Sequence, residues 1–540
     1  MCFEVRGRDL LGRIGRLETK SGVVETPLLL PVVNPAVQLI PPGELRRDFG
    51  CRAVITNAYL VWRRFGEEAV ERGVHGILGF DGVVMTDSGA YQILQYGGVD
   101  VEPDEIVRYQ EMINSDIAVI LDVPTGWGGR RHAVETVEET LRRARMLEET
   151  RTRADVLWVG PVQGGRHVDI VEYSAREMAK LPFHIYALGS PTEVMERYQF
   201  PLLVDMVMAA RMNLPPNKPL HLFGAGHPLT FPLAVAMGCD LFDSASYAIY
   251  ARDGRYITPN GTTRLERLRQ FPCSCPLCTR HEPAEVREWS QREREAFLAR
   301  HNLHVCLSEI RRIKQAIVDG RLWEYLEARA YAHPSLVQAL HRLGRYRAAL
   351  ERGTPISKRS ALFFGSHLEL ARPEVVRHGA RLLSRYRPPK EAKVLFLAAQ
   401  TPSRPTHRSK EYRRLMGELS EKLGEEARCV HFCTYVAPLG VVPIELCGVY
   451  PASQHEAAEP DYEVARHVAK QVYGYIRVMG YKAVFLLRGC NLLDVLVADA
   501  CRRASGELGL PVKEVCTENP WGVNAAELVE KLAGLLQRLR

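Results

Sequence analysis

Hydrophobic and polar residues follow a repeating order along the first half of the chain. Short apolar runs rich in β-branched residues are each followed by a turn and then by a charged stretch with helical periodicity. The runs that we interpret as buried strands lie near residues 26–33, 53–57, 83–87, 117–122, 156–163, 184–188, 220–223 and 240–243. Eight strand–helix units in about 250 residues predict an α/β protein with a (β/α)8 TIM barrel.

Polar residues stand where these predicted strands end. They are Asn57, Asp87, Asp122, Gln163, Gly189 and Asp243. In a TIM barrel the loops after the strands converge over one mouth, so we expect these residues around one pocket. Two carboxylates in one pocket suit glycosidic-bond chemistry, in which one attacks or stabilises the sugar carbon and the other protonates the leaving group. An aspartate at a strand end is also often only the N-cap of the next helix, so the pattern alone leaves both interpretations open.

The pattern of charged and apolar residues changes twice in the second half of the chain. Residues 283–353 are strongly charged with helical periodicity, which predicts a helical extension that offers Arg and Lys to a partner. Apolar strands are then expected at 394–398, 429–434, 483–487 and 511–516, followed by an amphipathic helix over 524–540. This order predicts a smaller three-layer α/β domain. The expected domains are therefore 1–282, 283–352 and 353–540.

Composition narrows the class of protein only slightly. The 540 residues are 46% hydrophobic and 25% charged, which is enough for two or three globular domains. The formal charge of +7 is compatible with a nucleic-acid partner, but a GC-rich genome or a hot habitat shifts composition in the same way. No apolar run approaches the roughly 20 residues that span a bilayer, and no signal-peptide pattern is present, so we expect a cytoplasmic protein without a membrane partner.

Three of the 13 cysteines lie close together, at Cys273, Cys275 and Cys278. Three thiolates in a turn, closed by an imidazole from a following helix, satisfy tetrahedral zinc without leaving an open position. The cluster therefore predicts one structural Zn²⁺ ion per chain. His301 and His304 are rival candidates for the fourth ligand, and spacing alone does not choose between them.

Several long strings resemble one family in both order and spacing. They are Thr86-Asp87-Ser88-Gly89, Leu121-Asp122-Val123-Pro124-Thr125, Gln163-Gly164, His221-Leu222-Phe223-Gly224-Ala225-Gly226-His227-Pro228, Asp240-Leu241-Phe242-Asp243-Ser244-Ala245-Ser246-Tyr247 and Phe271-Pro272-Cys273-Ser274-Cys275-Pro276-Leu277-Cys278. Over roughly residues 1–360 the chain resembles the archaeal tRNA-guanine transglycosylases. This family exchanges a guanine at position 15, in the D-arm of tRNA, for 7-cyano-7-deazaguanine (preQ0), which is a step in archaeosine biosynthesis.

The resemblance implies a role for each carboxylate in a retaining double displacement. Asp243 matches the nucleophile, which attacks the anomeric carbon of the ribose so that guanine leaves and the tRNA stays covalently attached. Asp87 matches the acid/base residue, which protonates the departing guanine and later takes a proton from the incoming base. Without the resemblance, the two aspartates would not be distinguished from helix caps.

The resemblance also implies a base pocket and a set of metal ligands. Asp122 matches a carboxylate that accepts hydrogen bonds from the guanine edge, and Gln163 matches an amide that reads the carbonyl side. Gly189 matches a backbone contact, Tyr91 an aromatic that stacks on the base, and Ser88 lies in the same substrate-binding string. Where the family usually has a second glycine, this chain has Ser190. The zinc ligands of the family match Cys273, Cys275, Cys278 and His301, which favours His301 over His304.

The C-terminal part departs from the usual pattern of these transglycosylases. No PUA-like RNA-binding stretch is recognised, and residues 394–490 instead resemble a domain of archaeosine synthase. The shared strings are Ala437-Pro438-Leu439-Gly440-Val441-Val442-Pro443-Ile444-Glu445-Leu446 and Tyr450-Pro451-Ala452-Ser453. After the strand at 394–398 that domain normally has a Pro-Cys-Ser motif and a nearby lysine, and both are missing here. We therefore expect a binding or scaffolding domain, in which His407, Arg408 and Lys410 contact phosphate or form a solvated helix start.

Three functional hypotheses follow from these observations. The first is an active transglycosylase, which retention of Asp87, Asp243 and the metal cluster favours. The second is an archaeosine-synthase-like enzyme whose barrel only binds tRNA, and the third is a non-catalytic tRNA-binding subunit. The resemblance further implies a homodimer that holds tRNA, with a separate PUA-domain protein as a candidate partner.

Overall fold

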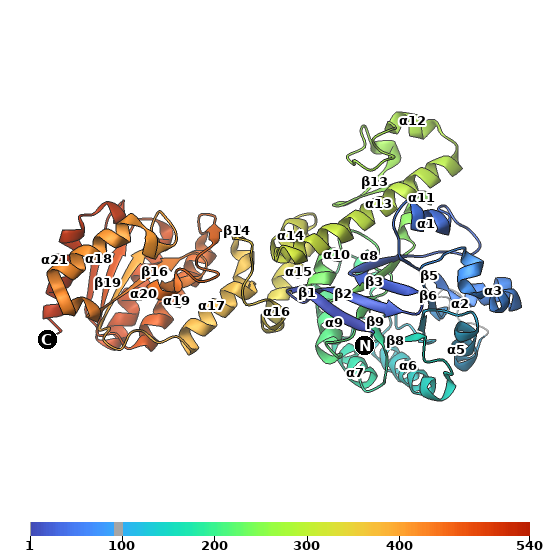
Figure 1. The fold of residues 1–540 in the computed structure, drawn as a ribbon, viewed down its shortest axis with the longest axis horizontal. Coiled ribbons are helices and arrows are strands. Elements are labelled where there is room, and N and C mark those ends of the chain that lie inside the picture. The colour runs from blue at the N-terminus through green and yellow to red at the C-terminus, as the bar shows by residue number, and fades with distance from the viewer. Residues whose placement is uncertain (1, 91–100, 540) are drawn as a thin grey trace. The chain divides into compact units, whose positions relative to one another are not determined.

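The computed structural model describes residues 2–90 and 101–539. The chain forms two compact units, Met1–Pro355 and Ile356–Arg540. Figure 1 shows the first unit from blue to yellow-green and the second from yellow to red. We describe each unit separately, and the division of the first unit into residues 1–282 and 283–352 stays a prediction.

The first unit is built on eight parallel strands in the order β4-β11-β10-β9-β8-β7-β6-β5. The strands are β4 (Leu28–Pro31), β5 (Ala53–Asn57), β6 (Val83–Asp87), β7 (Ile117–Val119), β8 (Leu157–Val162), β9 (Ile185–Leu188), β10 (Leu220–Leu222) and β11 (Leu241–Ser244). A parallel bridge between Val32 and Ile55 joins the two ends of this sheet, and the Val33 amide donates to the Ile55 carbonyl at 2.8 Å. The predicted TIM barrel and its eight strands are confirmed.

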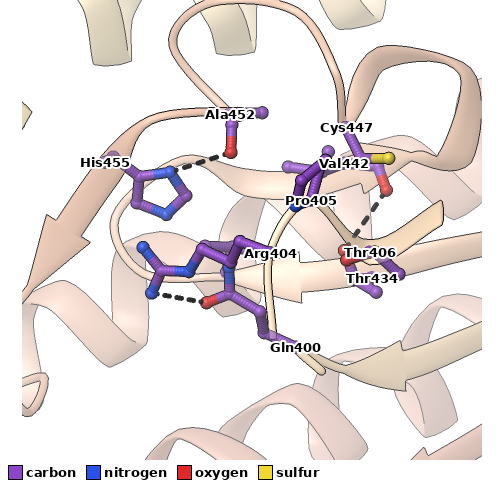
Figure 2. Close-up of a pocket in the computed structure, with 10 residues that line it drawn as sticks. Gln400, Arg404, Pro405, Thr406, Thr434, Val442, Cys447, Ala452 and His455 are labelled. Atoms are coloured by element: carbon purple, nitrogen blue, oxygen red, sulfur yellow. Dashed lines mark hydrogen bonds between the residues drawn. The ribbon is translucent and has the colours of Figure 1, made fainter. Parts of the chain in front are cut away.

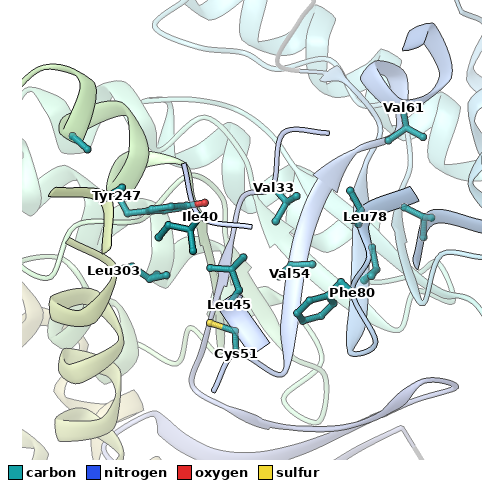
Figure 3. Packing of buried hydrophobic residues seen from close by; sticks show 14 of the residues in the cluster. Val33, Ile40, Leu45, Cys51, Val54, Val61, Leu78, Phe80, Tyr247 and Leu303 are labelled. Carbon is teal, nitrogen blue, oxygen red and sulfur yellow. The ribbon is translucent and has the colours of Figure 1, made fainter. Parts of the chain in front are cut away.

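Helices follow the barrel strands and cover them from outside. They are α2 (Ala58–Phe65), α3 (Glu67–Leu78), α5 (Pro103–Met112), α6 (Arg130–Thr150), α7 (Val168–Met178), α8 (Thr192–Glu196), α9 (Phe200–Asn213), α10 (Phe231–Ala236) and α11 (Ser246–Arg252). Figure 3 shows part of one buried apolar cluster, which includes Val54 of β5, Leu78 of α3 and Tyr247 of α11. The strands read as continuous apolar runs because both of their faces are buried.

A three-stranded antiparallel sheet closes the amino end of the barrel. Its strands are β1 (Phe3–Asp9), β2 (Gly12–Thr19) and β3 (Gly22–Thr26), which the apolar pattern did not predict as a separate sheet. Phe3 and Leu17 are buried against Ala53, Val83 and other residues that begin barrel strands. Apolar side chains fill this end of the barrel, so the polar residues that can take part in chemistry lie at the carboxyl ends of the strands.

The predicted helical extension is confirmed. It contains α12 (Pro283–Glu288), α13 (Gln291–Val318), α14 (Leu322–Ala330), α15 (Pro334–Leu343) and α16 (Arg347–Gly353). A capping box between Ser290 and Glu293 starts α13, which then runs without a break for 28 residues. The hairpin β12 (Arg255–Thr258) and β13 (Gly261–Arg264) precedes the extension.

The second unit contains a five-stranded sheet in the order β17-β16-β15-β19-β20. The strands are β15 (Val394–Ala399), β16 (Val430–Val436), β17 (Gly440–Pro443), β19 (Ala483–Arg488) and β20 (Val512–Cys516), and only β17 is antiparallel to its neighbour. Residues of α18 (Lys410–Leu423) and α21 (Ala525–Gln537) pack on one face, and those of α17 (Pro373–Ser384), α19 (Tyr462–Met479) and α20 (Leu492–Leu508) on the other. The predicted three-layer α/β domain is confirmed.

Two smaller observations complete the fold. The short strands β14 (Leu362–Phe364) and β18 (His455–Ala457) pair in parallel beside the five-stranded sheet. Across residues 2–90 and 101–539, no helix is both long enough and apolar enough to cross a membrane.

A buried ion pair fastens the N-terminal sheet to the barrel. Arg13 of β2 donates through Nε to Oδ1 of Asp240 at 3.0 Å, and its side chain and that of Asp240 are 7% and 1% exposed. Asp240 also accepts from the Leu220 amide at 2.9 Å, while Arg13 donates to the carbonyls of Pro216 and Lys218. Arg13 and Asp240 are both removed from water, so loss of either side chain leaves the other charge buried without this partner.

We predict that Arg13→Met lowers the free energy of unfolding by about 3–5 kcal/mol, because Asp240 stays buried without the guanidinium that donates to both of its carboxylate oxygens. Chemical denaturation of the purified protein measures this. The matched control is Arg6→Met, since Arg6 forms an exposed ion pair with Glu4 and its loss changes stability by less than about 1 kcal/mol. Equal effects of the two substitutions would contradict the prediction.

Candidate active site and metal centre

The two carboxylates singled out from the sequence lie at the carboxyl ends of barrel strands. Asp87 is the last residue of β6, and Asp243 is the third of the four residues of β11. Both strands end in a turn because the apolar run gives way to Ser and Gly after Asp87, and to Ser and Ala after Asp243. The barrel thereby brings together residues that are far apart in the chain.

Asp87 is held in a pocket that disfavours its ionised form. Its Oδ2 atom accepts hydrogen bonds from Nδ2 of Asn57 at 3.2 Å and from the Gly89 amide at 3.3 Å. Burial raises the pKa of Asp87 to about 7, and the negative charges of Asp122 and Asp243 add to this shift. A carboxyl group with such a pKa can both give and take a proton near neutral pH.

Asp243 is fixed by two groups from the loop and strand before it. The Gly224 amide donates to Oδ1 of Asp243 at 2.9 Å. Nε2 of His221 in β10 lies 2.9 Å from the same oxygen, although this contact does not have hydrogen-bond geometry. His221 is fully buried, whereas the side chain of Asp243 keeps 15% of its surface exposed. Both contacts are to Oδ1, so the carboxylate is oriented with its second oxygen free of these partners.

Asp122 and Gln163 meet close enough to Asp87 for the charge of Asp122 to act on it. Gln163 donates through Nε2 to Oδ2 of Asp122 at 2.5 Å. Burial raises the pKa of Asp122 to about 6, and the hydrogen bond from Gln163 limits the shift. Asp122 is therefore mainly ionised at neutral pH, and a buried carboxylate of this kind selects for a ligand with paired N–H donors.

Gly189 lies directly against Gln163. A Cβ atom at position 189 would stand 2.1 Å from Nε2 of Gln163, which no side chain tolerates. The glycine that follows β9 is therefore required by the close approach of the backbone to the pocket floor.

Ser190, at which the chain departs from the family pattern, proves to be part of the pocket. Its backbone has φ +58°, a left-handed conformation that glycine adopts easily and serine rarely. Its hydroxyl donates to Oε1 of Gln163 at 2.9 Å and accepts from the Gly126 amide at 2.9 Å. The Thr125 amide also donates to Oε1 of Gln163, at 3.2 Å. With Oε1 occupied by two donors, the amide of Gln163 is fixed with its NH₂ group toward Asp122.

The sequence pattern did not assign a role to Ser190 or His221. The only signal for Ser190 was its unusual residue type at a glycine position, and His221 lay within a matched string without a stated role. Their contacts depend on neighbouring strands of the barrel, which the linear pattern does not reveal.

Ser88 and Tyr91 are also predicted to bind substrate, and only Ser88 lies within the described residues. Ser88 is 1% exposed, and its hydroxyl has no hydrogen-bond partner within residues 2–90 and 101–539. Among the described residues, Ser88 is therefore a buried polar group next to Asp87 whose hydrogen-bonding capacity is not used. Tyr91 lies outside the described residues. The assigned roles of Asp87, Asp243, Ser88, Asp122, Gln163 and Gly189 stay predictions.

The four predicted metal ligands converge in the first unit. One ligand atom from each of Cys273, Cys275, Cys278 and His301 lies within 4.8 Å of the others, so this Cys₃His cluster can hold a metal ion. Nδ1 of His301 lies 3.3 Å from Sγ of Cys278 and 3.6 Å from Sγ of Cys275. Nε2 of His301 lies 2.8 Å from the Ile257 carbonyl, which orients the ring so that Nδ1 faces the thiols.

The structure separates the two rival histidines. His304, one turn further along α13, stacks against Phe49 with ring centroids 4.5 Å apart and is not part of the cluster. The ring of Tyr256 in β12 stacks on His301 with centroids 3.6 Å apart. His301 is therefore the histidine that closes the cluster.

The C-terminal unit has a small polar pocket beside the end of β15. Figure 2 shows Arg404 between His455 and Gln400, with Nη2 of Arg404 donating to Oε1 of Gln400 at 3.2 Å. Nδ1 of His455 lies 3.2 Å from the Ala452 carbonyl. The segment that lacks the expected cysteine thus still lines a pocket. Nδ1 of His407 lies 3.0 Å from Sγ of Cys447, which lines this pocket, and the predicted contact of His407 with phosphate stays a prediction.

Residues 9–335 match the family described as queuine tRNA-ribosyltransferase, and residues 375–527 match a domain of unknown function (DUF5591). A tRNA-guanine(15) transglycosylase of Aeropyrum pernix is 47% identical over 95% of this chain and 100% of its own length. Proteins with the same name from Pyrobaculum aerophilum and Methanosarcina mazei are 44% and 43% identical, over 90% and 85% of this chain and 95% and 89% of their own lengths.

The family match covers more than half of the chain and contains both strand-end aspartates, the pocket residues and the Cys₃His cluster. The full-length similarity to the A. pernix protein extends it through the C-terminal unit. The chain therefore belongs to the queuine tRNA-ribosyltransferase family, whose members are pentosyltransferases that act on tRNA.

Proposed function

We propose that this protein is a tRNA-guanine(15) transglycosylase that replaces guanine 15 in the D-arm of tRNA with preQ0. The observation that carries the proposal is the grouping of Asp87, Asp122 and Asp243, in which burial and like charge raise the pKa of Asp87 to about 7. A proton-transfer group thus lies beside an oriented carboxylate and a carboxylate suited to bind a base. This arrangement fits base exchange by double displacement.

In the first step, Asp243 attacks the anomeric carbon of nucleotide 15 through the oxygen that Gly224 does not hold. The new C–O bond forms as the glycosidic C–N bond breaks, and the tRNA remains attached as a glycosyl ester. Asp87 gives its proton to the departing guanine and is left ionised. The raised pKa of Asp87 makes its acid form available for this transfer at neutral pH.

In the second step, preQ0 replaces guanine in the pocket. Ionised Asp87 takes a proton from the incoming base, whose nitrogen attacks the anomeric carbon and displaces Asp243. Both carboxyl groups return to their starting states, and two displacements retain the configuration of the sugar.

Base selection rests on the floor of the pocket. Ionised Asp122 accepts N–H groups from the pyrimidine edge that guanine and preQ0 share. Gln163, fixed by Ser190 and Thr125, directs its amide N–H toward the carbonyl oxygen of the base. The Gly189 backbone and the Ser88 hydroxyl border the same space, and Tyr91 is the proposed stacking residue.

The Cys₃His cluster is proposed to hold one Zn²⁺ ion per chain. Three cysteines and one histidine are a typical tetrahedral donor set for structural zinc, and the hydrogen bond from His301 to Ile257 orients the imidazole for it. When bound, zinc would tie the loop of Cys273–Cys278 to α13. Because all four positions would be filled by the protein, its contribution is to stability.

The proposed partners are tRNA and a second copy of this chain, with a separate PUA-domain protein as a further candidate. For the C-terminal unit we propose a binding or scaffolding role, because the segment after β15 lacks the cysteine and lysine of archaeosine synthase. The protein is proposed to act in the cytoplasm, where its substrate is made.

We predict that Asp243→Ala and Asp87→Ala each abolish incorporation of labelled preQ0 into an unmodified archaeal tRNA transcript, by about 10³-fold or more. Asp243→Ala should also lose the covalent tRNA adduct on a denaturing gel. The control is Asp169→Ala, which removes an exposed carboxylate paired with Arg130 and leaves incorporation unchanged.

Other outcomes separate the alternatives. Incorporation by Asp243→Ala would reject the assigned nucleophile. Binding of tRNA without incorporation by the intact protein would favour a tRNA-binding subunit, and conversion of preQ0 already in tRNA would favour an archaeosine-synthase-like enzyme.

We predict that Asp87→Asn stabilises the protein at pH 8 and has little effect at pH 4. The folded carboxyl group has a pKa of about 7 against 3.8 for the ordinary value. Between these pH values the folded state holds a proton that the unfolded chain has released, so stability falls as pH rises. The resulting change in the free energy of unfolding is at most about 4 kcal/mol. Thermal melts at both pH values check this, and an equal change in melting temperature at both would contradict it.

We predict that His301→Ala releases zinc and lowers the melting temperature, because an open ligand position weakens the ion that ties α13 to the cysteine loop. Metal content and thermal unfolding are measured on the purified full chain. His304→Ala is the matched control and keeps one zinc per chain. Full zinc content in His301→Ala would reject the ligand set.

A further inference from the structure

Two cysteines of the C-terminal unit are unlike the other thiols of the chain. Of the 13 cysteines, which all lie within the described residues, only Cys490 and Cys516 are exposed. Unpaired cysteine is among the most frequently buried residue types, and it is kept at surfaces for reactivity more often than for packing. Neither cysteine belongs to the barrel, the Cys₃His cluster or the pocket of Figure 2.

The fold places these two thiols against each other. Cys516 is the last residue of β20 and pairs in register with Arg488, the last residue of β19. Cys490 follows β19 by two residues and stands next to Asn491, the N-cap of α20. Their Sγ atoms are 3.5 Å apart, which is van der Waals contact between two sulfurs. Residues 490 and 516 come together only because the two strands are neighbours in the sheet.

This arrangement is close to what a disulfide needs. A disulfide requires an S–S separation of about 2.05 Å and Cα atoms about 4.4–6.8 Å apart. The two Sγ atoms are already in contact at 3.5 Å, so a small change of side-chain torsion brings them to bonding distance. Cys490 lies in the turn after β19, where the side chain is exposed and has room to rotate.

We propose that Cys490 and Cys516 are a modification site that closes to an intramolecular disulfide by exchange with a small-molecule disulfide. One thiolate attacks a sulfur of the small disulfide, forming a mixed disulfide and releasing one small thiolate. The second cysteine thiolate then attacks the protein sulfur of the mixed disulfide and releases the other small thiolate. The two protein thiols are oxidised by two electrons, the small disulfide is reduced to two thiols, and the two protons pass to those products.

The charges around the pair are consistent with exchange that speeds up at alkaline pH. The neighbouring thiol of Cys516 raises the pKa of Cys490, and the guanidinium of Arg488 opposes this shift. Arg488 is itself paired with Glu514 at 2.6 Å, and Glu518 adds a negative charge near Cys490. The thiolate that starts the reaction therefore becomes more populated as the pH rises above neutrality.

The proposed disulfide between Cys490 and Cys516 would hold the edge of the five-stranded sheet. β20 is an edge strand of the five-stranded sheet, held by β19 on one side only. All five of its residues are half-buried or exposed, so little apolar burial fixes it. A bond between 490 and 516 closes a loop that contains the whole of α20 and ties the end of the edge strand to the sheet. Closing that loop restricts the unfolded chain and stabilises the folded unit.

The test uses the full-length protein, fully reduced and then incubated with oxidised glutathione at pH 8. Intact mass should show the loss of two hydrogens with no retained glutathione, and a non-reducing peptide map should show one cross-link between Cys490 and Cys516. The melting temperature of the C-terminal unit should rise on oxidation and return on reduction. The matched control is Cys429→Ser, which removes a half-exposed thiol elsewhere and leaves both effects intact.

Single substitutions complete the test. In Cys490→Ser and Cys516→Ser the cross-link and the change in melting temperature should both disappear, and a stable glutathione adduct should remain on the other cysteine. Retained glutathione on both cysteines of the unsubstituted protein would overturn the proposal. So would cross-linking between two chains, or two unmodified thiols after incubation.

Discussion

Closure of the eight-stranded sheet sets the geometry of everything else in the first unit. Val32 and Val33 meet Ile55 across the junction of β4 and β5, so every strand has a neighbour on both sides. Once the sheet is closed, the carboxyl ends of all strands face one mouth. Apolar side chains from β1–β3 plug the opposite end. Asp87, Asp122 and Asp243, separated by long stretches of chain, therefore share one pocket.

Bringing Asp87, Asp122 and Asp243 close together has an electrostatic cost, because the charges of the other two disfavour ionisation of Asp87. Burial and the neighbouring charges disfavour ionisation of Asp87, while Asp122 is stabilised by Gln163 and Asp243 by the Gly224 amide. The three groups are chemically alike but differ in environment, and the proposed mechanism uses this difference to separate a proton-transfer group from two groups that contact substrate. Ser190 contributes indirectly, because its hydroxyl donates to Oε1 of Gln163, and the NH₂ group of the same amide donates to Asp122.

Much of this could be predicted from the sequence, for reasons that differ between residues. The barrel strands were recognisable because parallel strands covered on both faces read as continuous apolar runs. Asp87, Asp122 and Gln163 stood out as polar residues at the ends of such runs, but only the resemblance to a family assigned their roles. Cys273–Cys278 was recognisable because metal ligands cluster in turns. The N-terminal sheet was missed because its strands are only partly buried, as in β1, where only the first and last residues are fully covered. β17 was missed because it is short and antiparallel to β16.

Periodicity and local turn chemistry were sufficient to define the elements, their order along the chain and the residue types available at the strand ends. Which residues meet was settled by the three-dimensional packing alone. Packing placed Ser190 against Gln163 and Cys490 beside Cys516, and it put His301 with the cysteines, as the resemblance had favoured but the spacing had left open. The reason is physical, because hydrogen bonds, burial and pKa shifts depend on distances between residues remote in the chain, and packing sets those distances.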